Sequence, residues 1–117
     1  MSKPGRYRGR HFTTYIDEVK ELRRRERIDE AERLSLKLVM ATEDESAIEK
    51  IGVAPWYYEE LAKIYRKRND YSKEISILER FAAQQHAPGV TPPKLLERLE
   101  RARSLAVSKI AGSSEHL

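Results

Sequence analysis

Residues 61–81, LAKIYRKRNDYSKEISILERF, contain two apolar-periodic runs separated by the polar tripeptide Arg68-Asn69-Asp70. Within each run the apolar residues recur every three or four positions, which is the pattern of a helix with one buried face. Asn and Asp favour turns, and an Asp directly before an apolar run can cap a helix by accepting a hydrogen bond from its first backbone amides. The stretch therefore predicts a helical hairpin whose second helix is capped by Asp70.

The same pattern occurs 43 residues earlier in the chain. Residues 22–39, LRRRERIDEAERLSLKLV, align without a gap on residues 65–82, YRKRNDYSKEISILERFA, so that the basic triplet, the turn and the start of the second helix all recur. Repetition at a fixed period indicates a repeat architecture. We therefore expect two helical hairpins in series.

Residues that begin or end helices divide the chain into five predicted helical segments. We expect helices over residues 14–25 and 28–40, a short turn of helix ended by Gly52, a third helix opening at Pro55, a fourth after Asp70 and a fifth opening at Thr91. Pro is well placed in the first turn of a helix because its missing N–H has no intrahelical partner there. No stretch shows the alternation of a strand, so the expected class is all-α with a single domain at 13–111.

The second hairpin resembles the tetratricopeptide repeat (TPR) over about 30 residues, and the first hairpin does so more loosely. The resemblance implies two antiparallel hairpins stacked as a right-handed array, closed by a C-terminal capping helix. Three positions depart from the family pattern, since Ala62 replaces a Gly, and Glu74 and Phe81 stand where small residues usually pack. A generic helical hairpin is the alternative. The residues that carry the resemblance are Tyr58, Leu61, Ala62, Tyr65, Asn69-Asp70-Tyr71, Ile75 and Leu78.

The resemblance also implies a binding groove, because the first helix of each hairpin lines the concave face in this family. Such a groove would be basic and would suit a peptide or partner protein, including an acidic one, through charge-assisted hydrogen bonds. The basic triplets also have a structural explanation, since cations near a helix C-terminus interact favourably with the helix dipole, and a Trp beside a Pro is often a core residue. The implied contact residues are Lys20, Arg23, Arg24, Trp56, Lys63, Arg66 and Lys67.

The basic character of the chain comes from its first ten residues. They carry four Lys and Arg residues and no acid, which equals the net charge of +4 of the whole chain. We expect residues 1–12 to form a flexible tail and residues 112–117 to form a frayed end. The alternative function is nucleic-acid binding by this tail. The residues that would contact nucleic acid are Arg6, Tyr7, Arg8 and Arg10.

The composition argues against several other classes of function. The chain has no Cys, and its three His residues lie far apart in sequence, so we expect no metal site and no cofactor. We find no spacing typical of a catalytic site and expect a protein that is not an enzyme. No apolar run is long enough to span a bilayer, and we expect a cytoplasmic protein that does not bind membranes. Two hairpins are few for a repeat array, which makes a homodimer plausible.

Overall fold

The fold was analysed from a computed structural model, which describes residues 3–115 and the side chains of residues 3–109. The described chain consists mostly of α-helices, preceded by a short β-hairpin. The elements are the strands β1 (Arg6–Tyr7) and β2 (Arg10–His11), the 3₁₀-helix η1 (Phe12–Tyr15) and the helices α1 (Ile16–Arg24), α2 (Ile28–Glu49), α3 (Trp56–Lys67), α4 (Tyr71–Ala82) and α5 (Thr91–Glu115).

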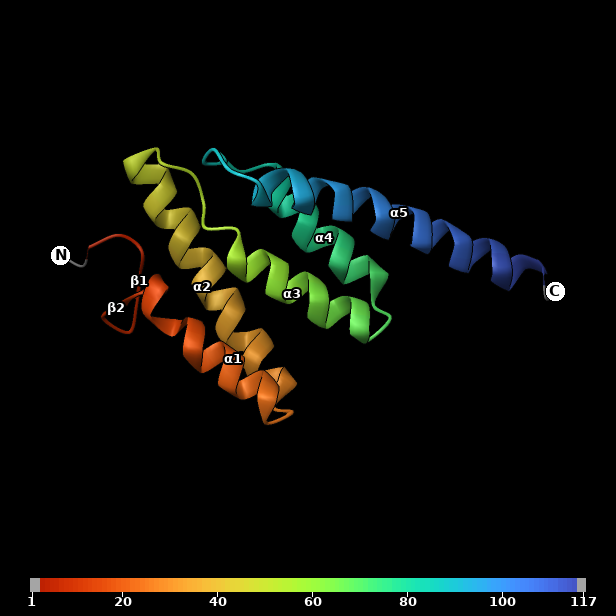
Figure 1. Cartoon of the computed structure of the whole chain (residues 1–117), viewed down its shortest axis with the longest axis horizontal. Coiled ribbons are helices and arrows are strands. Elements are labelled where there is room, and N and C mark those ends of the chain that lie inside the picture. Colours follow the sequence, from red (N-terminus) through yellow and green to blue (C-terminus); the bar gives the residue numbers. More distant parts are fainter. Residues whose placement is uncertain (1–2, 116–117) are drawn as a thin grey trace.

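The helices form a serial array in which each packs on the next one along the chain (Figure 1). The array is elongated, with principal extents of 58 × 32 × 23 Å. The N-terminal hairpin and the end of α5 lie at opposite ends of the longest axis (Figure 1). None of the described helices combines the length and the apolar character needed to cross a membrane.

The two hairpin turns have the same backbone geometry. Glu26 and Asn69 both adopt the left-handed conformation, with φ of 61° and 58°. The next amide then closes the turn on the preceding helix, as Arg27 N–H donates to the Leu22 carbonyl and Asp70 N–H to the Tyr65 carbonyl, both at 2.9 Å. Both pairs of positions differ by 43 residues, so the internal repeat inferred from the sequence is present in the backbone. Asp70 also caps α4 as expected, accepting from the Lys73 amide at 3.1 Å.

The core is centred on α3, which buries residues along most of its length. Tyr57, Tyr58 and Leu61 are almost completely inaccessible, and Phe81 of α4 packs edge-on against Tyr58 with 5.1 Å between the ring centroids. Burial of apolar side chains on this scale is the main favourable term in folding. The other largest buried apolar side chains of the core are Val19, Leu38, Val39, Ile64, Leu78 and Leu95.

Two buried phenols of α3 are satisfied by carboxylates of α2. Tyr58 donates to Glu43 at 2.7 Å, and Tyr65 donates to Glu32 at 2.8 Å. Each carboxylate also accepts from an arginine of the second hairpin, Glu43 from Arg80 and Glu32 from Arg68. These polar contacts join the two hairpins across α2 and fix the register between them.

The second helix is longer than we expected. The sequence indicated an end near residue 40 and a separate short turn, but α2 runs unbroken to Glu49. Thr42 and Ser46 are buried in its second half, and the Thr42 hydroxyl accepts from the Ala54 amide at 2.8 Å. The polar residues in this second half of α2 therefore belong to a packed helical surface.

The expected frayed end at residues 112–117 is also partly wrong, because residues 112–115 belong to α5, while residues 116–117 lie outside the described residues.

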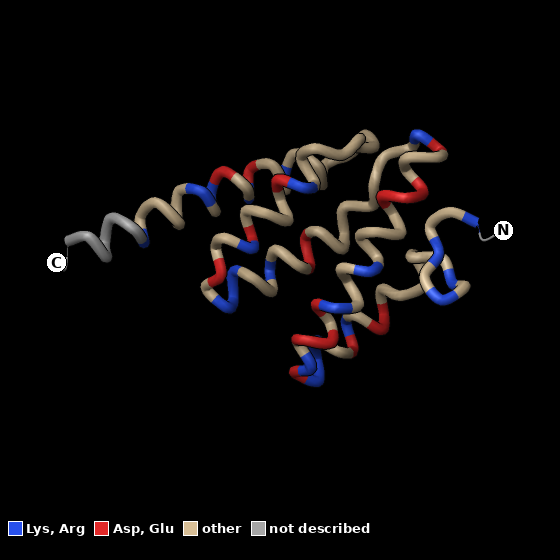
Figure 2. Tube along the Cα trace, turned by 180° about the vertical axis from the view of Figure 1, so that it is seen from behind, with Lys and Arg blue, Asp and Glu red and all other residues tan. Residues whose placement is uncertain are grey.

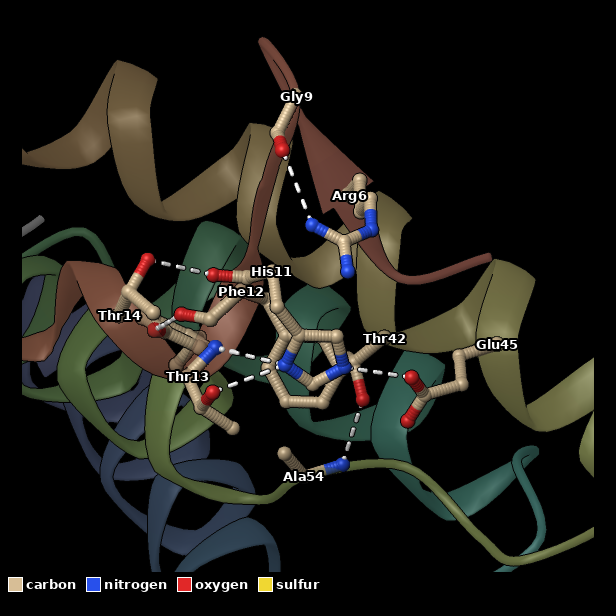
Figure 3. Close-up of polar contacts among 10 residues, drawn as sticks. Arg6, Gly9, His11, Phe12, Thr13, Thr14, Thr42, Glu45 and Ala54 are labelled. Atoms are coloured by element: carbon tan, nitrogen blue, oxygen red, sulfur yellow. Dashed lines mark hydrogen bonds and ion pairs between the residues drawn. The ribbon is translucent and has the colours of Figure 1, made fainter. Parts of the chain in front are cut away.

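Residues 6–12 are folded, contrary to the flexible tail expected for residues 1–12 and to the absence of strands, while residues 1–2 lie outside the described residues. Arg6 and Tyr7 pair with Arg10 and His11 in an antiparallel hairpin whose strands are joined by Arg8 and Gly9, both at positive φ. The hairpin is anchored on α2, where Glu45 lies 2.5 Å from the His11 ring (Figure 3). Phe12, 6% exposed, joins the core behind it. Strands of two residues are too short to leave an alternating pattern.

Candidate functional site

The seven residues expected in the groove occupy two helices and do not form one surface of free cations. Three of them lie on α1 and four on α3. Arg23 of α1 forms an ion pair with Glu60 of α3, a carboxylate that is only 6% exposed. This contact joins α1 to α3 and explains why Arg23 has little freedom to bind a ligand.

Arg24 is also engaged within the protein. Its guanidinium binds Glu21 at 2.5 Å, and Arg25 binds the same carboxylate at 2.7 Å. These hydrogen bonds lower the pKa of Glu21 to about 2 and raise the pKa of Arg24. The cluster at the end of α1 is a solvent-exposed ion-pair network. Lys20, exposed on the same helix, makes no ion pair with the described side chains.

The groove residues of α3 differ among themselves. Trp56 is half-buried and packs edge-on against Tyr57, with 5.1 Å between the ring centroids. Lys63 lies 3.4 Å from Glu59, one turn earlier on the helix. Lys67 is exposed and makes no ion pair with the described side chains. Arg66 points instead toward α4 and α5, and its surroundings are the most unusual polar site in the described chain.

A fully buried carboxylate lies beside Arg66. Glu74, in the first turn of α4, has no exposed surface, yet it is held between two guanidinium groups. The Arg66 Nε binds one of its oxygens at 2.6 Å, and the Arg98 Nε of α5 binds the other at 3.0 Å. A buried carboxylate requires such compensation, because its desolvation would otherwise cost several kcal/mol. Glu74 thus joins three helices at one point.

A cavity of about 350 Å³ opens between α3 and α5 at this point. Both helices pack on α4. A second depression, of about 360 Å³, continues along α5 past Ser104 to Leu105 and shares Arg66 and Arg101 with the first. We call the two together the α3–α5 groove. Its first part is lined by Glu59, Arg66, Lys94, Leu95, Glu97, Arg98 and Arg101.

The charges around the α3–α5 groove are mainly basic after internal pairing is taken into account. Glu59, at the edge of the groove, forms an ion pair with Lys63, and Glu100 forms one with Arg103 at 2.7 Å. Arg101 forms no ion pair with any described side chain, and Nη2 of Arg66 is inaccessible to solvent without a hydrogen-bond partner. The groove therefore offers the guanidinium of Arg101, which no described carboxylate pairs with.

The basic N-terminal residues form a second charged region on the folded hairpin, visible where Lys and Arg gather near the N-terminus (Figure 2). Arg6 donates to the Gly9 carbonyl at 3.0 Å, and Arg8 lies over the Tyr7 ring at 5.3 Å. Arg10 binds Glu18 at 2.5 Å, which raises the pKa of Arg10. Beside the hairpin a cavity of about 380 Å³ is lined by Arg6, Tyr7, Lys37, Met40, Ala41 and Asp44.

The polar contacts that position this hairpin are local and specific. The His11 ring lies between the Thr13 hydroxyl, at 2.8 Å from Nδ1, and Glu45, which approaches Nε2 (Figure 3). Gly5 lies against the same carboxylate, since a Cβ there would come within 2.5 Å of it. Within the described part of the chain, no three His, Asp or Glu side chains come together in a way that could hold a metal ion.

Among the seven contact residues expected from the sequence, only Arg66 lines the α3–α5 groove. Lys94, Arg98 and Arg101 of the capping helix carried no expected binding role, and Glu74 stands at a position where a small residue usually packs in the family. The available signal was the spacing of 94, 98 and 101, which places three cations on one face of α5. Comparisons with protein-family models, with curated proteins and with solved structures return no match.

Proposed function

We propose that this chain is a TPR-like protein-interaction module that binds an extended, acidic segment of a partner protein in the α3–α5 groove. The observation that supports it best is the pair of arginines held by the buried Glu74, next to a cavity with an additional cation, Arg101. Arginine suits such recognition because its planar guanidinium binds carboxylates through two parallel hydrogen bonds. The proposal moves the contact surface from α1 and α3 to α3 and α5.

The dimensions of the groove support a peptide rather than a small metabolite. Its two parts share residues and follow α5 from Lys94 to Leu105. Leu105 lies eleven residues after Lys94, which corresponds to roughly 16 Å along the helix. The end at Leu105, which is 38% exposed, is apolar, so the groove combines a cationic part with an apolar part. An extended segment with an acidic and an apolar side chain would fill both.

The test is selection of peptides from a random display library on the full chain. We expect selected peptides to be enriched in Asp and Glu and to lose at least about tenfold in affinity for Arg101→Glu. Arg101 is preferred to Arg66 for this test, because reversal of charge at Arg66 would place a second carboxylate beside the buried Glu74 and unfold the protein.

Lys109→Glu is the matched control, because Lys109 is an exposed cation on the same helix and lines neither part of the groove. Its affinity for the selected peptides should equal that of the wild type. Peptides that bind Arg101→Glu and wild type equally would show that the groove is not the binding site.

A second candidate function is nucleic-acid binding by the folded hairpin. The observation in its favour is that Lys37 of α2 joins Arg6 and Tyr7 around one cavity, so the basic surface includes the helical fold. Phosphate contacts of this kind make affinity fall with salt. Asp44 in the same lining and the pairing of Arg10 with Glu18 weaken the candidate.

Binding of labelled single- and double-stranded nucleic acid should separate this candidate from the first. If the hairpin binds nucleic acid, Arg8→Gln combined with Lys37→Gln should lower the affinity and reduce its salt dependence by about two phosphate contacts. Arg101→Gln should have no effect on it. Salt-insensitive or undetectable binding at low salt would exclude the candidate.

A further inference from the structure

The two arginines at Glu74 are each held through a single nitrogen, and their side chains remain partly exposed, at 29% for Arg66 and 25% for Arg98. Both Arg66 and Arg98 contact Glu74 through Nε. Their Nη atoms, which form the end of each guanidinium fork, are not used in these contacts, and Nη2 of Arg66 has no partner. Because Glu74 has no exposed surface, it cannot itself reach a ligand. It fixes the direction of two cations and leaves their ends for an anion.

The charge of the site exceeds what one carboxylate would neutralise. Four cations line the cavity, namely Arg66, Lys94, Arg98 and Arg101. Glu59 is paired with Lys63, which lies outside the lining, so the acids left to oppose the four cations are Glu74 and Glu97. The unbalanced charge is about +2. A phosphate monoester carries −1.5 to −2 at neutral pH and presents three acceptor oxygens.

We propose that the α3–α5 groove recognises a phosphorylated side chain, with the phosphoryl group bound by Arg66, Arg98 and Arg101. The inference rests on the proposed function, because it names the group that a partner segment presents to the same groove. Lys94, in the first turn of α5, supplies a further cation at the edge of the site. The apolar end of the groove near Leu105 then receives a neighbouring side chain of the partner.

The test uses three matched peptide libraries with randomised flanks and one fixed central residue, which is phosphoserine, glutamate or serine. Affinity for the full chain is measured at constant ionic strength by titration calorimetry. We expect the phosphoserine peptides to bind at least about tenfold more tightly than the serine peptides and several-fold more tightly than the glutamate peptides. Inorganic phosphate should compete, whereas acetate at equal ionic strength should not.

Variants locate the phosphoryl group. Arg101→Gln should lower the affinity for phosphoserine peptides about fivefold while the unfolding midpoint stays unchanged, since Arg101 does not contact Glu74. Lys109→Gln, on the same helix and outside both parts of the groove, is the control and should bind as the wild type does. Phosphate that competes equally well for Arg101→Gln and for the wild type would place the anion elsewhere and overturn the inference.

The outcomes separate this inference from the proposed function. If glutamate peptides bind as tightly as phosphoserine peptides and lose affinity in Arg101→Gln, the groove binds acidic segments and the phosphoryl inference is wrong. If no library binds, or if all bind Arg101→Gln as they bind wild type, both the inference and the proposed function fail.

Discussion

Glu74 is the residue whose chemistry most constrains the molecule. A carboxylate with no exposed surface is stable only when its lost hydration is replaced, and here Arg66 and Arg98 replace it from two other helices. A small side chain at this position would let the helices approach one another more closely. Glu74 instead forms ion pairs with Arg66 and Arg98, and these ion pairs orient the two guanidinium groups at the groove.

Replacement of Glu74 should therefore be costly. We expect Glu74→Gln to lower the free energy of unfolding by about 3–5 kcal/mol, because it leaves two partly buried guanidinium groups without a charged partner. Urea unfolding followed by circular dichroism measures this change. Glu79→Gln, on the exposed side of the same helix, is the control and should change stability by less than about 0.5 kcal/mol. Equal effects of the two substitutions would contradict the structural role of Glu74.

The buried phenols predict a loss of stability at alkaline pH. Burial raises the pKa of Tyr57 from 10.0 to about 12, and burial together with hydrogen bonds to carboxylates raises the pKa of Tyr58 and Tyr65. Because these folded-state values lie above the unfolded value, the stabilisation is complete below about pH 10 and is lost as the pH rises through about 12. Unfolding free energies and tyrosinate absorbance over this range provide the measurement.

Tyr57→Phe isolates one of these groups. It removes one ionisation, so its stability should decline less steeply than that of the wild type above pH 10.0. At neutral pH it should lose roughly 1 kcal/mol, since the Tyr57 hydroxyl donates to the Phe12 carbonyl. Titration of every tyrosine near its ordinary pKa in the folded protein would contradict the assigned burial.

Residue-level features were predictable where they depend on local chemistry. The cap at Asp70 follows from its position before an apolar run, and it is confirmed. The role of Glu74 was not predictable, because it depends on Arg98, which is 24 residues away in a different helix. A charged residue at a helical core position is compatible with either a misfit or a buried ion pair, and sequence spacing alone does not distinguish them.

At the scale of elements, the long connections are held together by backbone contact. The loop before α3 meets the loop before α5 through a bridge between Val53 and His86, and Gln85 donates its side-chain amide to the Lys50 carbonyl at 2.6 Å. Gly52 lies against this contact, because a Cβ there would come within 2.5 Å of the Ala87 backbone nitrogen. The two loops thus join the end of α2 to the start of α5.

Gly52→Ala should disrupt this contact. The substitution forces the loops apart and also introduces a side chain at a φ of +92°, so we expect it to lower the free energy of unfolding by roughly 3 kcal/mol. Gly9→Ala is the matched control, since Gly9 has a similar φ of +79° but nothing within 4 Å of its Cβ position. Its cost should be roughly 1 kcal/mol. Equal costs would show that the close approach of the loops contributes nothing.

Elements were predictable in proportion to their length and periodicity. The helices α3 and α4, which have clear apolar faces and a polar turn between them, were placed correctly. The continuation of α2 to Glu49 was missed because its second half buries the hydroxyl groups of Thr42 and Ser46 rather than large apolar side chains. The two-residue strands of the hairpin were missed because their pairing depends on His11 and Glu45, 34 residues apart.

At the scale of the whole molecule, a serial array creates a surface that no single hairpin has. The α3–α5 groove needs one helix from the second hairpin and one from the terminal helix, with α4 supplying Glu74 beneath them. The sequence indicated the repeat and its basic character. It could not indicate that Arg23 and Arg24 of α1 would form internal ion pairs with Glu60 and Glu21, while Arg101 of α5 forms none with a described side chain.

The most direct test of the account is to locate a display-selected peptide on the full chain by amide and arginine side-chain chemical shifts. The account predicts that the shifts concentrate on α3 and α5 around Arg66, Arg98 and Arg101, and that they disappear in Arg101→Glu but persist in Lys109→Glu. Shifts concentrated on α1, on α2 or on the N-terminal hairpin, with the α3–α5 groove unchanged, would contradict it.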